Sequence, residues 1–599
     1  MGNEAIGRGI VENGCAVATS YPGTPASEIL EAVATFARET ESRMHVEWSV
    51  NEKIAYEVAL AASYTGKRAA VSMKQVGLNV ASDPFMRSAY LGVKGGFLLV
   101  SADDPGPHSS QTEQDSRFFA MFAKIPVLDP SSPREAKEMV RLAFEMSEAY
   151  EIPVMLRPTT RICHARQTVP ILTPERDTRT ARFEKDPKRW CATPRFVTDL
   201  HRGLTAKIER LAADPRLAPV FFPGDGTRPR TCIVASGVAF AHAWDVLDEL
   251  GLAGSVDRFQ VKVPYPLAAE FIARVRADYD RVLVIEETYP VIEMQLVDRR
   301  IEGRVSRLVP NEGELTPEVI RGVVETFLGL APSPPAATAR PAGARPTLCA
   351  GCGHRAAYYA ISQTFPRGIF PGDIGCYTLG MNLGAVDTVH CMGAGISQAA
   401  GFYHAHAHDG QDFPTVVATI GDSTFFHSGV PALVNAASQK ARIIVVILDN
   451  ATTAMTGHQP TPQLGVTASG ERSRPILIRD LVLASGVSFL READAYDVES
   501  FTGLLKEADA YCRSENGGVA VIIASSPCVL AESGPRRAPQ AVRITEECSG
   551  CRECLDMFEC PALVWDEAAG RVGIRQAACN RCGVCLAVCP TSAIVAADC

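Results

Sequence analysis

The chain has 599 residues, enough for about four domains, and its 46% apolar and 21% charged residues are an ordinary balance for a globular protein. Its 59 basic and 68 acidic residues give a net charge of −9, so we expect no large basic surface and no nucleic-acid partner. The sequence shows neither a signal-peptide pattern nor an apolar run near the ~18 residues of a membrane helix, so we expect a cytoplasmic protein without membrane contacts.

Residues 1–165 are predicted to form an α/β domain. A helix over 2–13 and a short strand over 15–20 lead into the segment YPGTP (21–25), after which a second helix opens. A hydroxyl at a helix N-terminus can donate to an anion, which makes Thr24 a candidate contact for a substrate carboxylate. The alternative, locally the commoner case, is that Thr24 only caps the helix.

Glu52 is the second candidate residue of this domain, because it begins a predicted helix directly after a short strand over 46–50. A glutamate there can be catalytic, or it can simply favour the helix N-terminus by its charge. A later strand, 97–101, ends in a long polar loop over 102–119, where side chains for substrate contact can gather. The simpler alternative for that loop is a solvated surface.

The middle of the chain is less informative. Residues 166–225 are polar and irregular, and we expect a connecting segment. Residues 226–330 are predicted to be a small α/β domain, whose second strand ends in Glu286 and Glu287. These two carboxylates could be catalytic, but a polar strand end is the more usual reading. The Ala- and Pro-rich stretch 331–346 has the composition of a semi-rigid linker.

Residues 347–530 are predicted to form the domain with the most informative pair of strands. An apolar run ends in the tripeptide GDS (421–423), a helix follows, and a second apolar strand ends at Asn450. Ligands of open α/β sheets bind at the carboxyl ends of strands. The oxygens of Asp422 and Asn450 suit Mg²⁺, which adds phosphate oxygens and water to a few protein ligands. The simpler alternative is that these residues only end strands and make turns.

Two glycine-containing segments precede these strands. In CAGCGH (349–354) the two cysteines could be half of a metal site, but no second pair lies at zinc-finger spacing. The glycines and His354 instead suit the close approach of a cofactor to the backbone. Further on, Gly393 lies in a glycine turn that opens a helix, where phosphate oxygens can meet backbone N–H groups.

The C-terminal cysteines are the most specific pattern in the sequence. Nine of the 19 cysteines lie between Cys548 and Cys599, and eight of them form two repeats, the second of which matches the two-cluster ferredoxin run. Because the fourth cysteine of that run ligates the other cluster, the predicted [4Fe–4S] ligand sets are Cys548, Cys551, Cys554 and Cys589, and Cys579, Cys582, Cys585 and Cys560. Soft thiolates at this spacing suit iron–sulfur better than zinc. The first repeat has five residues before its last cysteine instead of three, which leaves the geometry at Cys560 open.

Six segments together carry a family resemblance: YPGTPASEI, NEKIAYEVALAAS, LCAGCGHRAAYY, GDIGCYTLG, MGAGIS and GDS…DNATTAMTGHQ. They closely resemble the large subunit of the indolepyruvate:ferredoxin oxidoreductases, a branch of the thiamine-diphosphate-dependent 2-oxoacid:ferredoxin oxidoreductases. The resemblance covers nearly the whole chain in family order. One departure is Gly353, which stands where many relatives carry proline.

The resemblance implies a multidomain α/β fold. Two thiamine-diphosphate-binding α/β domains would occupy 1–165 and 347–530, and a small transketolase-C-terminal-like α/β domain would occupy 226–330. A ferredoxin-like α+β domain for two [4Fe–4S] clusters would occupy 540–599.

The resemblance also implies roles for the candidate residues. Glu52 would bond the pyrimidine ring of thiamine diphosphate and so assist proton removal by the cofactor. Mg²⁺ would be held by Asp422, Asn450 and the backbone carbonyl of Thr452. The residues beside the cofactor would be Gly421, Ser423, Gly393 and His354.

The implied reaction is oxidative decarboxylation of a 2-oxo acid, with acyl transfer to coenzyme A and electrons passing through two iron–sulfur clusters to ferredoxin. The implied substrates are aryl 2-oxo acids, indolepyruvate first and phenylpyruvate-type acids next. The resemblance implies a separate small beta subunit and an α2β2 heterotetramer. Two alternatives stay open: a related oxidoreductase with another 2-oxo acid or an NAD-linked acceptor reached through further subunits, and a non-catalytic electron-transfer subunit.

Overall fold

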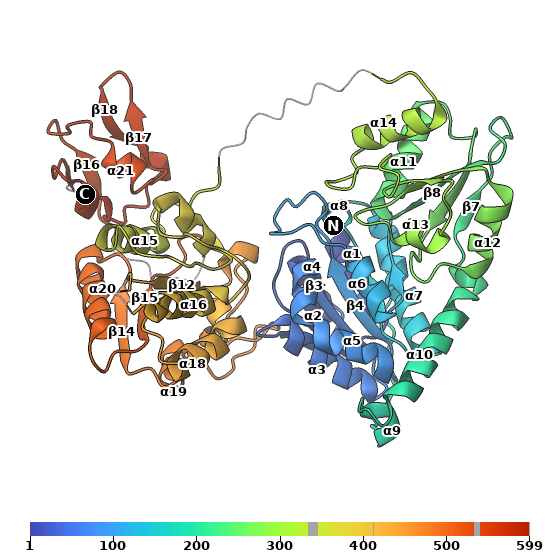
Figure 1. Ribbon diagram of the computed structural model, residues 1–599, viewed down its shortest axis with the longest axis horizontal. Helices are drawn as coiled ribbons and strands as arrows, with labels where there is room; N and C mark the ends of the chain where they lie inside the picture. Colours follow the sequence, from blue (N-terminus) through green and yellow to red (C-terminus); the bar gives the residue numbers. More distant parts are fainter. Residues whose placement is uncertain (334–344, 411–412, 532–538, 598–599) are drawn as a thin grey trace. The chain divides into compact units, whose positions relative to one another are not determined.

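The computed structural model (Figure 1) divides into two compact units, Met1–Ala339 and Arg340–Cys599. The residues that it describes are 1–333, 345–410, 413–531 and 539–597. Most of the predicted linker, 331–346, lies outside them. Within the described ranges, no helix is both long enough and apolar enough to span a membrane, and all 18 cysteines are free.

The first unit begins with a six-stranded parallel sheet in the order β2-β1-β3-β4-β6-β5. Its central strands β3 and β4 are buried at every position, as expected for a parallel sheet with helices on both faces. The strands are β1 (Val17–Ser20), β2 (His45–Trp48), β3 (Ala69–Lys74), β4 (Phe97–Ala102), β5 (Val127–Leu128) and β6 (Val154–Leu156). The helices are α1 (Gly2–Glu12), α2 (Ser27–Glu39), α3 (Glu52–Tyr64), α4 (Gln75–Val80), α5 (Ser82–Leu91), α6 (Ser116–Ala123), α7 (Pro133–Tyr150) and α8 (Thr160–His164).

A five-stranded sheet in the order β11-β10-β8-β9-β7 follows in the same unit, and only its edge strand β7 is antiparallel. The strands are β7 (Val220–Phe222), β8 (Thr231–Ser236), β9 (Asp257–Val261), β10 (Arg281–Ile285) and β11 (Ile301–Glu302). The helices are α11 (Gly237–Glu249), α12 (Ala269–Asp278), α13 (Val291–Leu296) and α14 (Pro317–Leu328).

The segment 166–225 is not irregular throughout, which corrects the prediction. It contains α9 (Pro187–Trp190) and the 16-residue helix α10 (Val197–Ala212), and it ends in β7, which pairs with β9. Helix α10 buries only Leu204 and Leu211. An apolar stripe of two residues is too narrow to stand out in a polar sequence.

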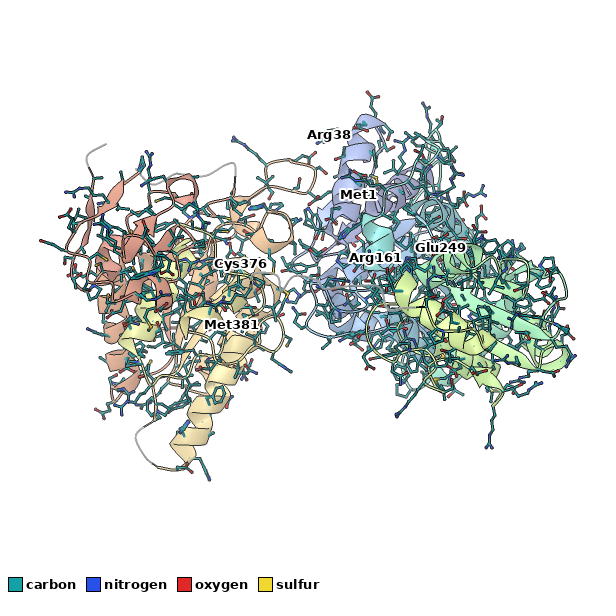
Figure 2. All side chains as sticks on the ribbon, turned by 90° about the horizontal axis from the view of Figure 1, so that it is seen from above. Met1, Arg38, Arg161, Glu249, Cys376 and Met381 are labelled. Carbon is teal, nitrogen blue, oxygen red and sulfur yellow. The ribbon has the colours of Figure 1, made fainter. Side chains whose placement is uncertain are left out.

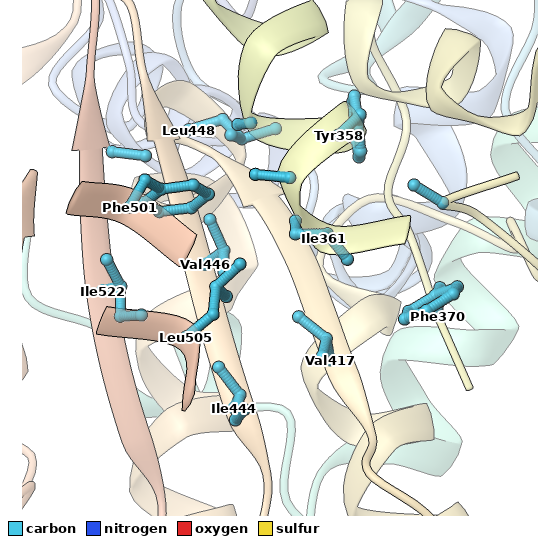
Figure 3. Close-up of a cluster of buried hydrophobic side chains, with 14 of the residues drawn as sticks. Tyr358, Ile361, Phe370, Val417, Ile444, Val446, Leu448, Phe501, Leu505 and Ile522 are labelled. Carbon is cyan, nitrogen blue, oxygen red and sulfur yellow. The ribbon is translucent and has the colours of Figure 1, made fainter. Parts of the chain in front are cut away.

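The second unit contains a four-stranded parallel sheet in the order β12-β13-β15-β14. Alternate residues of each strand point to opposite faces, and both faces carry a core. Val446 belongs to the same core as Tyr358 and Phe501 on one face (Figure 3), and Val445 and Ile447 belong to the core on the other. The strands are β12 (Val417–Gly421), β13 (Ile444–Asp449), β14 (Phe489–Asp494) and β15 (Ala520–Ser525). The helices are α15 (Gly353–Thr364), η2 (Cys376–Leu383), α16 (Ala394–His408), α17 (Asp422–Thr424), α18 (Val430–Ser438), α19 (Ile478–Ala484) and α20 (Val498–Arg513).

The C-terminal part of the second unit consists of two antiparallel ribbons and two short helices. Its elements are β16 (Val542–Ile544) paired with β19 (Ile594–Ala596), β17 (Leu563–Asp566) paired with β18 (Arg571–Ile574), α21 (Glu553–Asp556) and α22 (Cys585–Val588). Its small core includes Ala356 and Tyr359, so this part packs on α15. The α/β class with parallel sheets is confirmed for the large sheets, whereas the ferredoxin-like class of this C-terminal part stays a prediction.

Candidate functional site

Asp422 is a fully buried carboxylate at the carboxyl end of β12. Gly421 makes room for the neighbouring ring of Tyr377, since a Cβ at 421 would lie 1.8 Å from that ring. Oδ1 of Asp422 accepts from the backbone N–H of Ser423 over 2.8 Å and from the Tyr377 hydroxyl over 3.3 Å, whereas Oδ2 has no hydrogen-bond partner among the described residues. Burial, and then the charge of Asp449, raises the pKa of Asp422 to about 8. A bound cation would stabilise the charged form of such a buried carboxylate.

Asn450 and Thr452 follow the next strand, β13, and reach the same place. Oδ1 of Asn450 accepts from the backbone N–H of Thr452 over 3.1 Å, and that N–H also lowers the pKa of the nearby Asp422 carboxyl, against the larger effect of burial. Nδ2 of Asn450 lies 3.2 Å from Nε2 of His354 in α15. Burial lowers the pKa of His354 to about 4, so its ring is neutral at pH 7. The structure thus brings four of the predicted cofactor residues together.

Gly393 opens α16 with a left-handed backbone, φ 83°, and a Cβ there would lie 2.4 Å from the Cβ of Ser428. Its N–H donates to both carboxylate oxygens of Asp373 over 3.0 Å, and the N–H of Gly395 also bonds that carboxylate. Burial raises the pKa of Asp373 to about 7. The anion at this turn is a protein carboxylate, so a phosphate contact by Gly393 stays a prediction.

A small cavity in the C-terminal part is lined by four thiols, those of Cys560, Cys579, Cys582 and Cys585. They are the second predicted ligand set. Burial, followed by the charges of the other three, raises the pKa of Cys585 to about 12. The first predicted set is also gathered, because Cys554 has its pKa raised to about 11 by burial and then by Cys589, Cys551 and Cys548.

Arg355 of α15 explains how the longer spacing before Cys560 is accommodated. Its buried guanidinium donates to the backbone carbonyls of Phe558 over 2.8 Å and Glu559 over 2.6 Å. It also donates to the carbonyl of Leu348. The residues just before Cys560 are therefore held against α15, and Cys560 still lines the cavity.

Another group of cysteines is not predicted by the sequence pattern. One pocket is lined by both Asn450 and His354 and by the thiols of Cys349, Cys352, Cys376 and Cys528. Cys376, labelled in Figure 2, has its pKa raised to about 11 by burial and then by Cys528 and Cys349. The only signal in the sequence is the half-site Cys349-x-x-Cys352. Its partners follow distant segments, which only the fold brings together.

No three His, Cys, Asp or Glu side chains in the described ranges are gathered tightly enough to hold a single metal ion. A [4Fe–4S] cluster is larger than an ion, and its thiolates each bind a different iron, so the wider thiol groups fit it better than zinc. Mg²⁺ takes only a few protein oxygens, including amide and backbone oxygens. Asp422 with Asn450 and Thr452 therefore suits that ion.

Glu52 lies in the first unit, at the first position of α3. The side chain of Asn51 caps this helix by accepting from the backbone N–H of Ile54 over 2.9 Å. Glu52 is only 6% exposed, and a Cβ on Gly77 would lie 2.6 Å from its Oε1. A glutamate that only stabilised the helix N-terminus by its charge could remain exposed to solvent. The burial and close packing of Glu52 therefore favour a further role for its carboxylate.

Thr24 does not cap the following helix, which removes the simpler alternative for it. Helix α2 begins at Ser27, and its N-cap residue is Ala26. The Ser27 hydroxyl accepts from the backbone N–H of Gly23 over 2.9 Å. The carbonyl of Thr24 lies 3.4 Å from the donating hydroxyl of Ser109 in the polar loop after β4. A substrate contact by Thr24 stays a prediction.

Comparisons with known proteins address both units. Residues 8–200 match the family "Pyruvate flavodoxin/ferredoxin oxidoreductase, thiamine diP-bdg", and residues 373–524 match "Thiamine pyrophosphate enzyme, C-terminal TPP binding domain". The indolepyruvate oxidoreductase subunit IorA of Methanothermobacter thermautotrophicus is 40% identical over 99% of this chain and 96% of its own length. The same subunit of Archaeoglobus fulgidus is 37% identical over 99% and 96%.

Among solved structures, 2-oxoglutarate:ferredoxin oxidoreductase from Magnetococcus marinus covers 55% of this chain and 64% of its own, with 17% identity and a TM-score of 0.44. That likeness is too low to carry an argument, whereas the sequence relatives match from end to end. The two thiamine-diphosphate family matches cover Glu52 and Asp422 respectively. The chain therefore belongs to the IorA family of indolepyruvate oxidoreductase subunits, and it is a thiamine-diphosphate-dependent 2-oxo acid oxidoreductase.

Proposed function

We propose that this chain catalyses the oxidative decarboxylation of aryl 2-oxo acids, indolepyruvate first and phenylpyruvate-type acids next. The acyl group goes to coenzyme A, and the electrons leave through iron–sulfur clusters to ferredoxin. The names of relatives at 37–40% identity support the indolepyruvate side chain. The observation that carries the electron route is the cavity lined by four of the predicted cluster cysteines.

The residues around Asp422 fit Mg²⁺ and a diphosphate. When bound, thiamine diphosphate supplies the nucleophilic carbon and the electron sink for decarboxylation. The unpartnered Oδ2 of Asp422 would bind the ion, together with Oδ1 of Asn450 and the carbonyl of Thr452. Neutral His354 fixes the Asn450 amide by the 3.2 Å contact.

Glu52 is the proposed acid–base residue of the first unit. Its carboxylate would hold a proton shared with a ring nitrogen of the cofactor, which makes the ring a better base. The capped helix start and the packing of Gly77 fix the position of this carboxylate. A fixed position is what a proton relay needs, because proton transfer requires hydrogen-bond distance.

The unpredicted thiols add a step to the electron route. Cys349, Cys352, Cys376 and Cys528 share a pocket with Asn450, so we propose that they hold a third iron–sulfur cluster beside the cofactor. The loop that carries two of these thiols also lines the next cavity, through Ala350 and Gly351. Nδ2 of Asn580 donates to the carbonyl of Ala350 over 2.6 Å, which joins the two places. Electrons would pass from this cluster to the one at Cys579 and then to the one at Cys554.

Partners follow from the family. The name IorA implies a partner subunit, and we propose a small beta subunit in an α2β2 heterotetramer of the cytoplasm. Of the alternatives, an NAD-linked enzyme would differ from the proposed ferredoxin-linked enzyme only in the final electron acceptor. A non-catalytic electron-transfer subunit is disfavoured by the retained Glu52, Asp422 and Asn450.

The test is anaerobic reduction of the protein, co-expressed with its partner subunit, in the presence of thiamine diphosphate, Mg²⁺ and coenzyme A. Indolepyruvate should bleach the visible absorbance of the iron–sulfur clusters, and pyruvate and 2-oxoglutarate should not. Bleaching by pyruvate or 2-oxoglutarate alone would keep the chemistry and discard the aryl substrate. Clusters that are present but bleached by no 2-oxo acid would favour the electron-transfer subunit.

A further inference from the structure

Lys74 is a buried lysine at the end of a central strand. It is the last residue of β3, between β1 and β4 in the sheet, and it is only 9% exposed. Its Nζ donates to the backbone carbonyl of Ser109 over 2.8 Å and lies 3.4 Å from the Ser109 hydroxyl. It forms no ion pair with any carboxylate of the described chain. Burying an ammonium group without a counter-ion is costly, so this position calls for an anion.

Asp104 is the acid whose charge acts on Lys74, and its carboxylate oxygens are hydrogen-bonded to other groups. Its Oδ2 accepts from the backbone N–H of Ser109 over 2.9 Å and from the Ser110 hydroxyl over 2.7 Å, and its Oδ1 accepts from the Thr160 hydroxyl over 2.7 Å. These bonds shape the polar loop after β4. Burial lowers the pKa of Lys74 to about 8, and the charge of Asp104 opposes that shift without reversing it.

The surroundings of Lys74 are the candidate residues of this unit. A Cβ on Gly23 would lie 3.0 Å from the Cβ of Lys74, so the segment that carries Thr24 passes directly beside it. Three residues further on, Gly77 packs against the carboxylate of Glu52. Lys74 therefore lies at the carboxyl end of β3, beside the segment that carries Thr24 and three residues before the glycine that packs on Glu52, at the edge where ligands of such sheets bind.

We propose that Lys74 binds the carboxylate of the 2-oxo acid substrate and so positions its reacting carbon. This inference rests on the proposed function in one respect, that the substrate is a 2-oxo acid. It does not depend on the aryl side chain, because every 2-oxo acid has this carboxylate. In the reaction the bond between the carboxylate and the reacting carbon breaks, its electron pair stays with that carbon, and CO₂ leaves. The ammonium group keeps its proton throughout.

The expected signature follows from that charge change. The ion pair is strongest before bond breaking and weakens as the carboxylate becomes neutral CO₂, so it contributes to substrate binding rather than to the chemical step. A charge-assisted hydrogen bond of this kind corresponds to about a 10–100-fold change in affinity. We expect Lys74→Met to raise KM by about that factor with kcat changed by less than about threefold.

The pH profile separates recognition of charge from a structural role. The wild-type kcat/KM should fall as pH rises through about 8, because the ammonium group loses its proton there. Lys74→Arg should have a KM closer to that of the wild type than to that of Lys74→Met. Its kcat/KM should show no such fall, since a guanidinium does not titrate in this range. Asp104 is the acid whose charge acts on Lys74. The loop after β4 that the ammonium group contacts also carries Asp103, His108 and Glu113. The neighbouring segments carry Tyr21 and Glu52.

The experiment uses the holoenzyme with its partner subunit and whichever of indolepyruvate, phenylpyruvate, pyruvate or 2-oxoglutarate reduces the clusters. Calorimetric titration with indole-3-propionate, an unreactive carboxylate, gives a second readout, and its binding should weaken in Lys74→Met. An unchanged KM and an unchanged calorimetric affinity would overturn the inference and leave the proposed function standing. No turnover of any 2-oxo acid by the wild type would overturn both. If Lys74→Met fails to fold, Lys74→Arg decides: a KM near wild type without the alkaline fall supports the inference, and an alkaline fall kept unchanged refutes it.

Discussion

At the scale of single residues, Glu52 is the sharpest test of the acid–base assignment. Glu52→Gln keeps the shape of the side chain and the capped start of α3 but cannot share a proton with a ring nitrogen. We expect kcat to fall by about 10²–10⁴-fold, the usual contribution of a positioned acid–base group. Cluster content, measured by iron analysis and electron paramagnetic resonance, should stay at the wild-type level. Turnover retained in this variant would remove Glu52 from the mechanism.

Asp422 makes a prediction about the cofactor-free protein as well as the loaded one. Asp422→Asn removes a buried carboxylate that lacks a cation, so the cofactor-free protein should gain about 1–2 kcal/mol of stability. The same change should abolish the rise in melting temperature that thiamine diphosphate and Mg²⁺ cause in the wild type. The exposed substitution Asp480→Asn is the matched control and should keep that rise. A full ligand-induced rise in Asp422→Asn would contradict the magnesium assignment.

Glu287 gives the pH dependence of the first unit. Burial raises its pKa from 4.5 to about 7, and its Oε2 has no hydrogen-bond partner among the described residues. Between these two values the folded protein holds a proton that the unfolded chain releases, so stability falls as pH rises from about 4.5 to about 7. Glu287→Gln cannot titrate and should be more stable than wild type at pH 8, by about 1–3 kcal/mol. Urea unfolding at pH 5 and pH 8 measures this, and an equal gain at both values would exclude titration of Glu287 as the cause.

At the scale of elements, the two strand–loop junctions of the second unit show what a sequence can predict. The apolar runs that end at Gly421 and Asn450 predict β12 and β13, because a buried parallel strand is apolar without interruption. The local cysteine repeats predict which thiols gather, because their spacing is local. Cys376 and Cys528 follow no local pattern, and they join Cys349 only through the packing of η2 and the loop after β15. Helix α10 is missed for a different reason: it buries only two apolar side chains, so its sequence has no clear apolar stripe.

The proposed third cluster is tested by a pair of cysteine substitutions. Cys528→Ser should remove the iron of one [4Fe–4S] cluster, about four atoms per chain, and leave the two others. Cys512→Ser is the control, because Cys512 is also a free cysteine but is buried in the hydrophobic core beneath α20, whereas Cys528 is half-buried in the pocket. Equal iron content in both variants would mean that the pocket beside Asn450 holds no cluster.

At the scale of the whole molecule, buried ion pairs connect the six-stranded and the five-stranded sheet regions of the first unit. Arg117 of α6 lies 2.7 Å from Asp115 and 3.2 Å from Glu286, which ends a strand of the five-stranded sheet. All three are completely buried, so removing the arginine leaves carboxylates without a counter-ion. The residue types alone do not predict this junction, because Glu286 pairs with Arg117, which is distant in sequence and lies in a helix that packs with the other sheet.

Arg117→Met should therefore lower the stability of the first unit by about 3–5 kcal/mol, the usual cost of breaking a buried pair. The matched control is Arg141→Met, whose ion pair with Glu145 is exposed and should contribute less than about 1 kcal/mol. Urea unfolding followed by circular dichroism measures both. A loss of similar size in the two variants would mean that the junction does not depend on this arginine.

Gly351 has a consequence for the speed of the enzyme. It adopts φ 73°, and a Cβ there would lie 2.7 Å from the Cβ of Asn580, so a single methyl group would push the C-terminal part away from α15. On the proposed assignment, electrons tunnel across this contact, and tunnelling rates fall exponentially with the gap between donor and acceptor. The absence of a side chain at Gly351 would then set the distance between the two clusters. A larger residue at this position would increase that distance, leave decarboxylation intact and make electron transfer to the acceptor the slow step.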